Sequence, residues 1–370
     1  MVQDIVLGNA LEPLAAYKVR VAALAAGFPV TTSSMALNRF CSSGLMAVKA
    51  IAESIKAGSI DCGLAIGAES MSQSPDNGAG SISSSVSSHP LAADALQPMG
   101  WTSENVALDF NISREKHDYY AAASFQRAEK AQKNGWFEEE IVPVETTQKD
   151  PKTGEEKKVI VTKDDGIRYG TTQESLGKIR KAFPQWGIGA TTGGNASQIT
   201  DGAGAVLLMR RSTAEALGQP IIAKYVHAVV VGLEPRIMGI GPAFAIPKLL
   251  NTLGLKKEDI DAFEINEAFA SMLAYCIETL GLPHEKVNPN GGAIAFGHPL
   301  GATGARSVLR FISSLICFLD KLLLDFRISA EQRARLSLLR CVLVCPLELV
   351  TANELGTGMG AAALFINEAN

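Results

Sequence analysis

The sequence predicts an α/β protein whose sheets contain buried parallel strands. Apolar, strand-like runs alternate with segments of helical period through the first seventy residues, and the alternation resumes from Ile221 onward. At 370 residues and 47% hydrophobic, the chain is also large and apolar enough to bury cores in two or more domains.

The first seventy residues contain two strand–helix units. A strand is expected at Ile5-Val6-Leu7, followed by a helix over residues 14–26. The next helix stops at Gly58, and its apolar residues recur at helical spacing on one face: Leu45, Val48, Ile51 and Ile55. Another strand then follows at Gly63-Leu64-Ala65-Ile66.

Residues 72–198 have a different pattern, which we interpret as a loop domain inserted over the scaffold. The segment is Ser-rich at 81–88, contains a helix expected around 113–134, and carries a strongly charged turn at 150–156. Residues 1–71, completed by about 199–215, would form one half of the scaffold, and 216–370 the other half. The two halves resemble each other faintly, because a strand precedes a glycine-containing turn in each.

Composition argues against several classes of partner. The formal net charge is −4 without a basic block, so nucleic acid is not an expected partner. Five isolated histidines and six scattered cysteines lack ligand or disulfide spacing, so neither a metal site nor a disulfide framework is expected. The longest apolar stretch, 315–324, contains two charges and is too short to span a membrane. The N-terminus does not read as a signal peptide, and the C-terminus is not a Ser-Lys-Leu peroxisomal address.

The most informative stretch is the glycine-rich segment 288–306, which contains His298. Glycines at this density let the backbone approach a ligand closely or adopt positive φ. Pro299 restricts the backbone directly after the histidine, so the imidazole is held in one orientation. The segment predicts a catalytic or ligand-facing His298, with a purely structural glycine-rich turn as the alternative.

Two further segments carry candidate chemistry. Cys41 lies at or next to the N-terminus of the predicted helix, where unpaired backbone N–H groups favour a thiolate. The alternative is a buried structural cysteine. Asn266 and Glu267 follow the strand-like segment 262–265, and this strand-to-helix junction is also compatible with an ordinary helix cap.

Together these segments resemble the thiolase family, and within it most closely the 3-ketoacyl-CoA thiolases of peroxisomal type. The resemblance runs from about Asp4 to Arg306 and returns at Gly356 to Phe365. It includes the motifs at 67–72, 193–197, 238–242 and 356–360. It implies a five-layered αβαβα body of two similar βαβαβαββ halves plus a loop domain. It also implies a homodimer in peroxisomes, with coenzyme A as co-substrate and no other cofactor.

The resemblance also implies roles for individual residues. A thiolase cleaves a 3-ketoacyl-CoA with CoA, giving acetyl-CoA and an acyl-CoA shortened by two carbons. Cys41 would be the nucleophile, His298 would help to deprotonate it, and Asn266 would hold a water beside the thioester oxygen. The N–H groups of Cys41 and Gly356 would form a second oxyanion hole. The residues implied in substrate binding are Ser197, Met99, Met238, Phe269 and, at a CoA phosphate, Arg168. From the residues alone, Ser197 would be a turn residue and the two methionines and Phe269 core packing.

The chain departs from the family pattern in two places. The family has an acid/base cysteine two residues before the glycine matched by Gly356, and here that position is Glu354. The segment 307–353 is longer than expected and lacks the expected buried strand, with Cys341 and Cys345 at the wrong distance from Gly356. Family members also carry several dozen more residues ahead of the nucleophile. A divergent isoform, a pseudoenzyme and a gene model with a missed start and a retained intron are three open interpretations.

Three functional hypotheses follow. The leading one is a 3-ketoacyl-CoA thiolase of fatty-acid β-oxidation, favoured by Cys41, His298 and Asn266. The second is a catalytically impaired thiolase-like protein that binds acyl-CoA or partners, favoured by Glu354 and the short N-terminus. The third, a ketoacyl synthase relative, is disfavoured by the Asn-Glu-Ala-Phe segment at 266–269.

Overall fold

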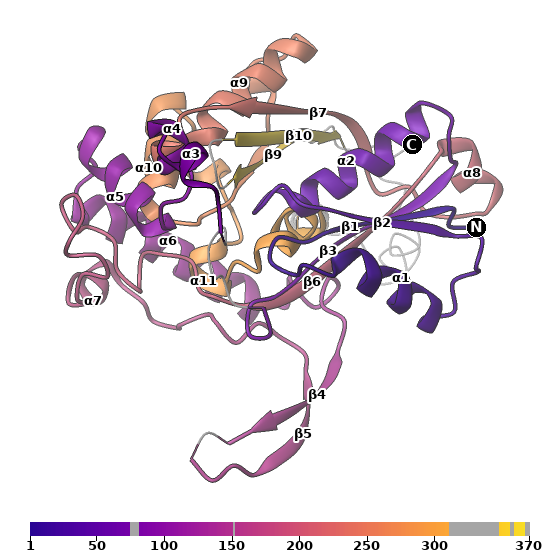
Figure 1. Ribbon diagram of the computed structural model, residues 1–370, viewed down its shortest axis with the longest axis horizontal. Helices are drawn as coiled ribbons and strands as arrows, with labels where there is room; N and C mark the ends of the chain where they lie inside the picture. Colours follow the sequence, from indigo (N-terminus) through magenta and orange to yellow (C-terminus); the bar gives the residue numbers. More distant parts are fainter. Residues whose placement is uncertain (75–80, 151, 311–347, 356–358, 367–370) are drawn as a thin grey trace, which may run out of the picture.

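Two four-stranded sheets form the framework of the protein in a computed structural model (Figure 1). The structure describes residues 1–74, 81–150, 152–310, 348–355 and 359–366. One sheet has the strand order β2-β1-β3-β6 and the other β7-β10-β9-β8. Parallel and antiparallel pairs occur in both sheets, so the predicted α/β class with parallel strands is confirmed.

The first sheet is built mainly from the N-terminal strand–helix units. Its elements are β1 (Asp4–Gly8), α1 (Ala15–Ala25), β2 (Ser33–Leu37), α2 (Ser43–Lys56) and β3 (Cys62–Ser70). β1 pairs in parallel with both β2 and β3, because each connecting helix returns the chain to the same end of the sheet. The fourth strand, β6 (Asp201–Met209), pairs antiparallel with β3 after a long excursion of the chain.

That excursion consists mostly of short helices and one long helix. Its elements are α3 (Ser84–Ser87), α4 (Pro90–Asp94), α5 (Met99–Asp109), α6 (Arg114–Lys133), β4 (Val144–Lys149), β5 (Glu156–Val161) and α7 (Gln173–Gly177). The long helix α6 begins where the sequence predicted, because the side chain of Ser113 accepts a hydrogen bond from the N–H of Lys116. β4 and β5 form an antiparallel hairpin that projects away from the rest of the molecule (Figure 1).

The second sheet belongs to the C-terminal part of the chain. Its elements in order are α8 (Arg211–Ala216), β7 (Lys224–Gly232), η1 (Pro235–Ile240), α9 (Gly241–Leu253), η2 (Lys257–Asp259), β8 (Ala262–Ile265), α10 (Ala270–Leu280), η3 (His284–Lys286), α11 (Ala293–Phe296), a helix at residues 300–310, β9 (Glu348–Leu355) and β10 (Met359–Ile366). The expectation that a strand is lacking before Gly356 was wrong. β9 forms there and pairs with β8 on one side and β10 on the other.

Helices fill the layers between and outside the two sheets. α1 packs on β1 and β2, and α9 packs on β7, β9 and β10, so each sheet has an outer helical layer. Between the sheets lie α2 and the helix at 300–310, whose Val48 and Val308 share one core cluster with Val6 of the first sheet and Ala361 of the second. The order of layers is therefore αβαβα, as the resemblance implied.

Candidate active site

Glycine contacts bring the start of α2 against the start of the helix at 300–310. A Cβ atom added to Gly44 would lie 2.6 Å from the carbonyl oxygen of Gly301 and 2.7 Å from the nitrogen of Ala305. A Cβ on Gly67 of β3 would lie 2.5 Å from the same carbonyl oxygen. Only glycine fits at these positions, so the backbones touch. Cys41, three residues before Gly44, and His298, three residues before Gly301, therefore lie at the same junction.

Cys41 lies two residues ahead of the first residue of α2 and is 8% exposed. The turn that holds it is rigid, because the Ser43 hydroxyl accepts from the N–H of Arg39 at 2.8 Å and donates to the carbonyl of Phe40 at 2.6 Å. Phe40 itself has φ of +48°, a conformation that a bulky side chain rarely adopts. A cysteine at such a position precedes the unpaired N–H groups of the first helical turn, an environment that generally favours a thiolate.

His298 is buried and contacts a polar group at each ring nitrogen. Nδ1 lies 2.6 Å from the hydroxyl of Thr303, and Nε2 lies 3.2 Å from Nδ2 of Asn266. An amide nitrogen can only donate, so Nε2 accepts and Nδ1 carries the proton that is donated to Thr303. Burial lowers the pKa of His298 to about 4, which keeps the ring neutral at physiological pH. A neutral imidazole is the form that can accept a proton from a thiol.

Thr303 is a site residue that sequence reasoning missed. It lies in the first turns of the helix at 300–310, five residues after His298 and inside the same glycine-rich segment. The available signal was a hydroxyl residue one helical turn beyond the proline that follows the histidine. Its hydroxyl accepts the Nδ1 proton and so supports the tautomer that the Asn266 amide requires at Nε2.

Asn266 follows β8 directly and is 4% exposed. The alternative of an ordinary cap at this junction was wrong, because α10 begins later, after Phe269, and has no side-chain cap. Glu267 has a structural task instead. Its carboxylate accepts from Ser124 at 2.6 Å and from the amide of Asn288 at 2.7 Å. These bonds fix the start of the segment that leads to His298. Burial raises the pKa of Glu267, and the hydrogen bonds from Ser124 and Asn288 act in the opposite direction.

Glu69, at the end of β3, is a second residue that sequence reasoning missed. One carboxylate oxygen accepts from the N–H of Ala10 at 2.8 Å and from the N–H of Gly301 at 3.0 Å. The other oxygen accepts from the N–H of Leu11 at 3.1 Å. One buried carboxylate thus ties the first sheet to the start of the helix that follows His298. The signal available in the sequence was a charged residue at the end of an apolar strand.

The Ser197 loop lies beside both the His298 and the Asn266 segments. The N–H of Ser197 donates to the carbonyl of Ala268 at 2.9 Å, two residues after Asn266. The carbonyl of the next residue, Gln198, accepts from the N–H of His298 at 3.0 Å. Ser197 is half-buried, and its part in binding stays a prediction.

The other predicted binding residues lie on elements around this junction. Phe269 is half-buried beside Ala196, with which it forms an isolated β-bridge. Met99 begins α5, which packs against η1, and η1 contains the buried Met238. Arg168 is exposed and donates to the carbonyl of Asp165 at 2.8 Å. The part of these four side chains in binding stays a prediction.

The C-terminal candidates are described only in part. Glu354 lies in β9, opposite Gly360 of β10 in the strand register. Gly356 lies outside the described residues, and so do Cys341 and Cys345.

In the part of the chain that the structure describes, no helix has the length and apolar character needed to cross a membrane.

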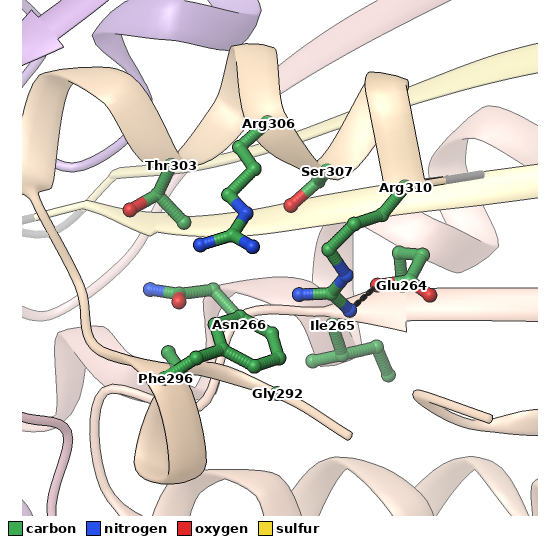
Figure 2. A pocket seen from close by; sticks show the side chains of 10 residues that line it. Glu264, Ile265, Asn266, Gly292, Phe296, Thr303, Arg306, Ser307 and Arg310 are labelled. Carbon is green, nitrogen blue, oxygen red and sulfur yellow. Dashed lines mark hydrogen bonds and ion pairs between the residues drawn. The ribbon is translucent and has the colours of Figure 1, made fainter. Parts of the chain in front are cut away.

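A small polar cavity lies on the inner side of Asn266, between β8 and the helix at 300–310 (Figure 2). Arg310 forms an ion pair with Glu264, and Arg306 pairs with Asp164 at 2.6 Å and with Glu140 at 3.1 Å. Burial raises the pKa of Glu264 to about 7, although the Arg310 charge acts in the opposite direction. Both guanidinium groups lie over the ring of Phe296.

Solved structures of thiolases superpose on this chain. The dimeric peroxisomal thiolase of Saccharomyces cerevisiae superposes with a TM-score of 0.85 and 44% identity, over 99% of this chain and 85% of that one. Human mitochondrial 3-ketoacyl-CoA thiolase in complex with CoA superposes with a TM-score of 0.80 and 32% identity, over 99% of this chain and 87% of that one.

Sequence comparison leads to the same class. The thiolase N-terminal domain matches residues 1–212, and the thiolase C-terminal domain matches residues 219–318. The peroxisomal 3-ketoacyl-CoA thiolase of Yarrowia lipolytica is 49% identical over all of this chain and 82% of its own length. The human peroxisomal 3-ketoacyl-CoA thiolase is 49% identical over 98% of this chain and 79% of its own length. The chain belongs to the thiolase family.

Proposed function

We propose that this protein cleaves 3-ketoacyl-CoA with CoA, giving acetyl-CoA and an acyl-CoA shortened by two carbons, in peroxisomal fatty-acid β-oxidation. The observation that carries the proposal is the neutral, buried His298 held by Thr303 and Asn266 at the same backbone junction as Cys41. Relatives that share about half of its residues are named peroxisomal 3-ketoacyl-CoA thiolases.

In the first half of the reaction, Cys41 is the nucleophile. Nε2 of His298 takes the thiol proton, and the sulfur attacks the 3-keto carbon of the substrate. The bond between C2 and C3 then breaks, which leaves the shortened acyl group on Cys41 and an acetyl-CoA enolate. Asn266, through a bound water, and the His298 ring stabilise the enolate oxygen until the acid/base group at position 354 gives a proton to C2.

In the second half of the reaction, CoA releases the acyl group. The acid/base group at position 354 takes the proton of the CoA sulfur, and the sulfur attacks the thioester carbon. The Cys41 thiolate leaves and recovers its proton from His298. The N–H groups of Cys41 and Gly356 hold the oxyanion of this step. The pantetheine and thioester parts of the ligand contact Ser197, Met99, Met238 and Phe269. A phosphate of CoA contacts Arg168. Residues 72–198 form the loop domain that covers CoA. Residues 1–71 together with 199–215 form one half of the scaffold beneath it, and residues 216–370 form the other half.

A second candidate is a catalytically impaired thiolase-like protein that binds acyl-CoA or partners without turnover. Glu354 favours it, because this position carries the family's acid/base cysteine and a carboxyl group is a poor relay for a thiol proton. The two candidates differ in the second half of the reaction, since acylation of Cys41 does not depend on residue 354.

The test is incubation of the purified chain with a 3-ketoacyl-CoA, alone and with CoA. Mass spectrometry without CoA should find the acyl group on the peptide that contains Cys41, and adding CoA should release it as acyl-CoA. Cys41→Ala should abolish labelling, whereas Cys62→Ala, which removes another buried cysteine, should not. Label on Cys62 or on no cysteine would refute the proposed nucleophile.

A further inference from the structure

The polar faces of β8 and of the helix at 300–310 meet below Asn266. Glu264 and Asn266 are two residues apart along an extended segment, so their side chains point to the same face. Thr303, Arg306, Ser307 and Arg310 follow the spacing i, i+3, i+4, i+7, which places them along one face of the helix. Figure 2 shows these two rows of side chains facing each other across the cavity.

Three polar atoms of residues lining this cavity are buried without a hydrogen-bond partner among the described residues. They are Oδ1 of Asn266, Oε1 of Glu264 and Nε of Arg310. Leaving such atoms unpaired inside a protein is costly, so a folded protein normally gives each of them a partner. Two of the atoms accept hydrogen bonds and one donates. One water molecule offers the complementary set, with two hydrogens to donate and lone pairs to accept.

The size of the cavity fits the same occupant. Its accessible volume is about 10 Å³. A buried water needs a volume of roughly this size and two to four polar partners. A metal ion is a poorer match, because Arg306 and Arg310 bring two positive charges to the lining and Glu264 is already paired.

We propose that a water molecule in this cavity joins Asn266 to the Glu264–Arg310 ion pair, and that the pair thereby positions the Asn266 amide. An amide can rotate by 180° at small cost unless both its ends are bound. With Oδ1 held by the water, Nδ2 is kept toward Nε2 of His298, the orientation that the structure shows. This inference rests on the proposed function for its catalytic consequence, and Glu264 and Arg310 are positioning residues that do not touch substrate.

The first test is a crystal structure of the unmodified chain at a resolution that reveals ordered water. Density for one water within hydrogen-bond distance of Asn266 Oδ1 and Glu264 Oε1 is the expected result. A protein group bonded directly to Oδ1, or a cavity without density, would overturn the inference. This test does not depend on enzymatic activity, so it stands even if the chain is never acylated and the proposed function fails.

The second test measures the consequence in the double variant Glu264→Leu/Arg310→Met. Replacing both members of a buried pair by apolar residues of similar volume is often tolerated, whereas removing one leaves an unpaired buried charge. We expect the rate of Cys41 acylation by 3-ketoacyl-CoA to fall about tenfold relative to Cys41 alkylation by iodoacetamide. Alkylation needs the thiolate but no oxyanion site, so it reports an intact fold around the sulfur.

The matched control is Asp61→Leu/Arg210→Met, which removes an ion pair far from the junction, with N–O distance 2.6 Å. Its ratio of acylation to alkylation should equal that of the parent. An unchanged ratio in the Glu264→Leu/Arg310→Met variant, with alkylation at the parental rate, would refute the positioning role even if the water is present.

Discussion

At the scale of single residues, the protonation state of His298 is set by what surrounds it. Among the described residues no charged group offsets the burial of the ring, so its pKa falls to about 4. Asn266 and Thr303 together determine which ring nitrogen carries the proton. Cys41 and His298 were predictable from glycine, proline and helix signals in the sequence. Thr303 and Glu69 were not, because their importance lies in contacts that only the fold creates.

Replacing Thr303 by Val should impair catalysis more than stability. The methyl group cannot accept the proton of Nδ1, so the other tautomer becomes accessible and Nε2 loses its lone pair for part of the time. We expect Cys41 acylation to slow by roughly 10- to 100-fold, which is the usual size of the effect of losing such a supporting contact. Thr303→Ser keeps the hydroxyl and should retain most of the rate. Equal rates in Thr303→Val and Thr303→Ser would contradict the orienting role.

The buried His298 should also make stability depend on pH. Its pKa is lower in the folded state than the ordinary value of 6.5, so the unfolded chain binds more protons between about pH 6.5 and 4. Its contribution to the free energy of unfolding is present above that window and is lost as the pH falls through it, by about 1.4 kcal/mol per pH unit. His284, with a pKa of about 4, adds a term of the same sign, and Glu264, with a raised pKa, adds one of opposite sign.

The measurement is urea unfolding of the parent and of His298→Gln between pH 4 and 6.5. The difference in slope between the two proteins isolates His298, because His284 and Glu264 are present in both. We expect the slope of the variant to be smaller by about 1.4 kcal/mol per pH unit. Parallel curves would mean that His298 is protonated as easily in the folded as in the unfolded chain.

Glu354 should limit the second half of the reaction. General acid–base catalysis is typically worth roughly 10²–10⁴ in rate, so the chain should acylate Cys41 but turn over slowly by about that factor. In Glu354→Cys, release of the acyl group by CoA should become faster, as followed by the loss of 3-ketoacyl-CoA absorbance. Fast release in the parent would show that another group transfers the proton.

At the scale of elements, the strand–helix alternation was largely readable from the sequence, because strand and helix periods differ clearly in buried segments. α2 and α6 begin and end within a residue or two of the predicted limits. β9 was missed, since its sequence Glu348–Leu355 mixes charged and apolar residues and is a strand only through pairing with β8 and β10. The contact between the start of α2 and the start of the helix at 300–310 could not be predicted from the sequence either, because only the tertiary structure brings these two segments together.

Gly44→Ala should separate the two helices that carry the junction. The new methyl group would lie 2.6 Å from the carbonyl oxygen of Gly301, so either α2 or the helix at 300–310 must shift. Overpacking of this kind costs about 1–3 kcal/mol of stability. Acylation should fall as well, because Cys41 and His298 move relative to each other. Thermal unfolding and acylation rates of Gly44→Ala are the measurements.

Gly177→Ala is the matched control for Gly44→Ala. It lies at the exposed end of α7, where an added Cβ would meet an oxygen of Asp118 at an ordinary 4.0 Å. Its unfolding temperature and acylation rate should stay at the parental values. If Gly44→Ala behaves like this control, the two helix starts are not in rigid contact.

At the scale of the whole molecule, we expect a homodimer. β2 is one of the two edge strands of the first sheet among the described residues, and Met35 on it and Phe40 just beyond it are exposed. An apolar edge strand is a liability unless another surface covers it. Light scattering should give twice the 39.1 kDa of the chain at micromolar concentration. Met35→Lys should shift the mass toward that of the monomer, and a stable monomeric parent would contradict the expectation.

Because the β4–β5 hairpin projects from the molecule, proteolytic cleavage within it should leave the two fragments associated. Lys152, in its exposed turn, is a site that trypsin can reach in the native protein, because a two-stranded hairpin without a covering layer is held weakly. Cleavage there would leave one fragment with β1, β2 and β3 and another with β6 and the second sheet. β3 and β6 remain paired along nine residues, so the nicked protein would migrate as one particle under native conditions and as two bands in detergent.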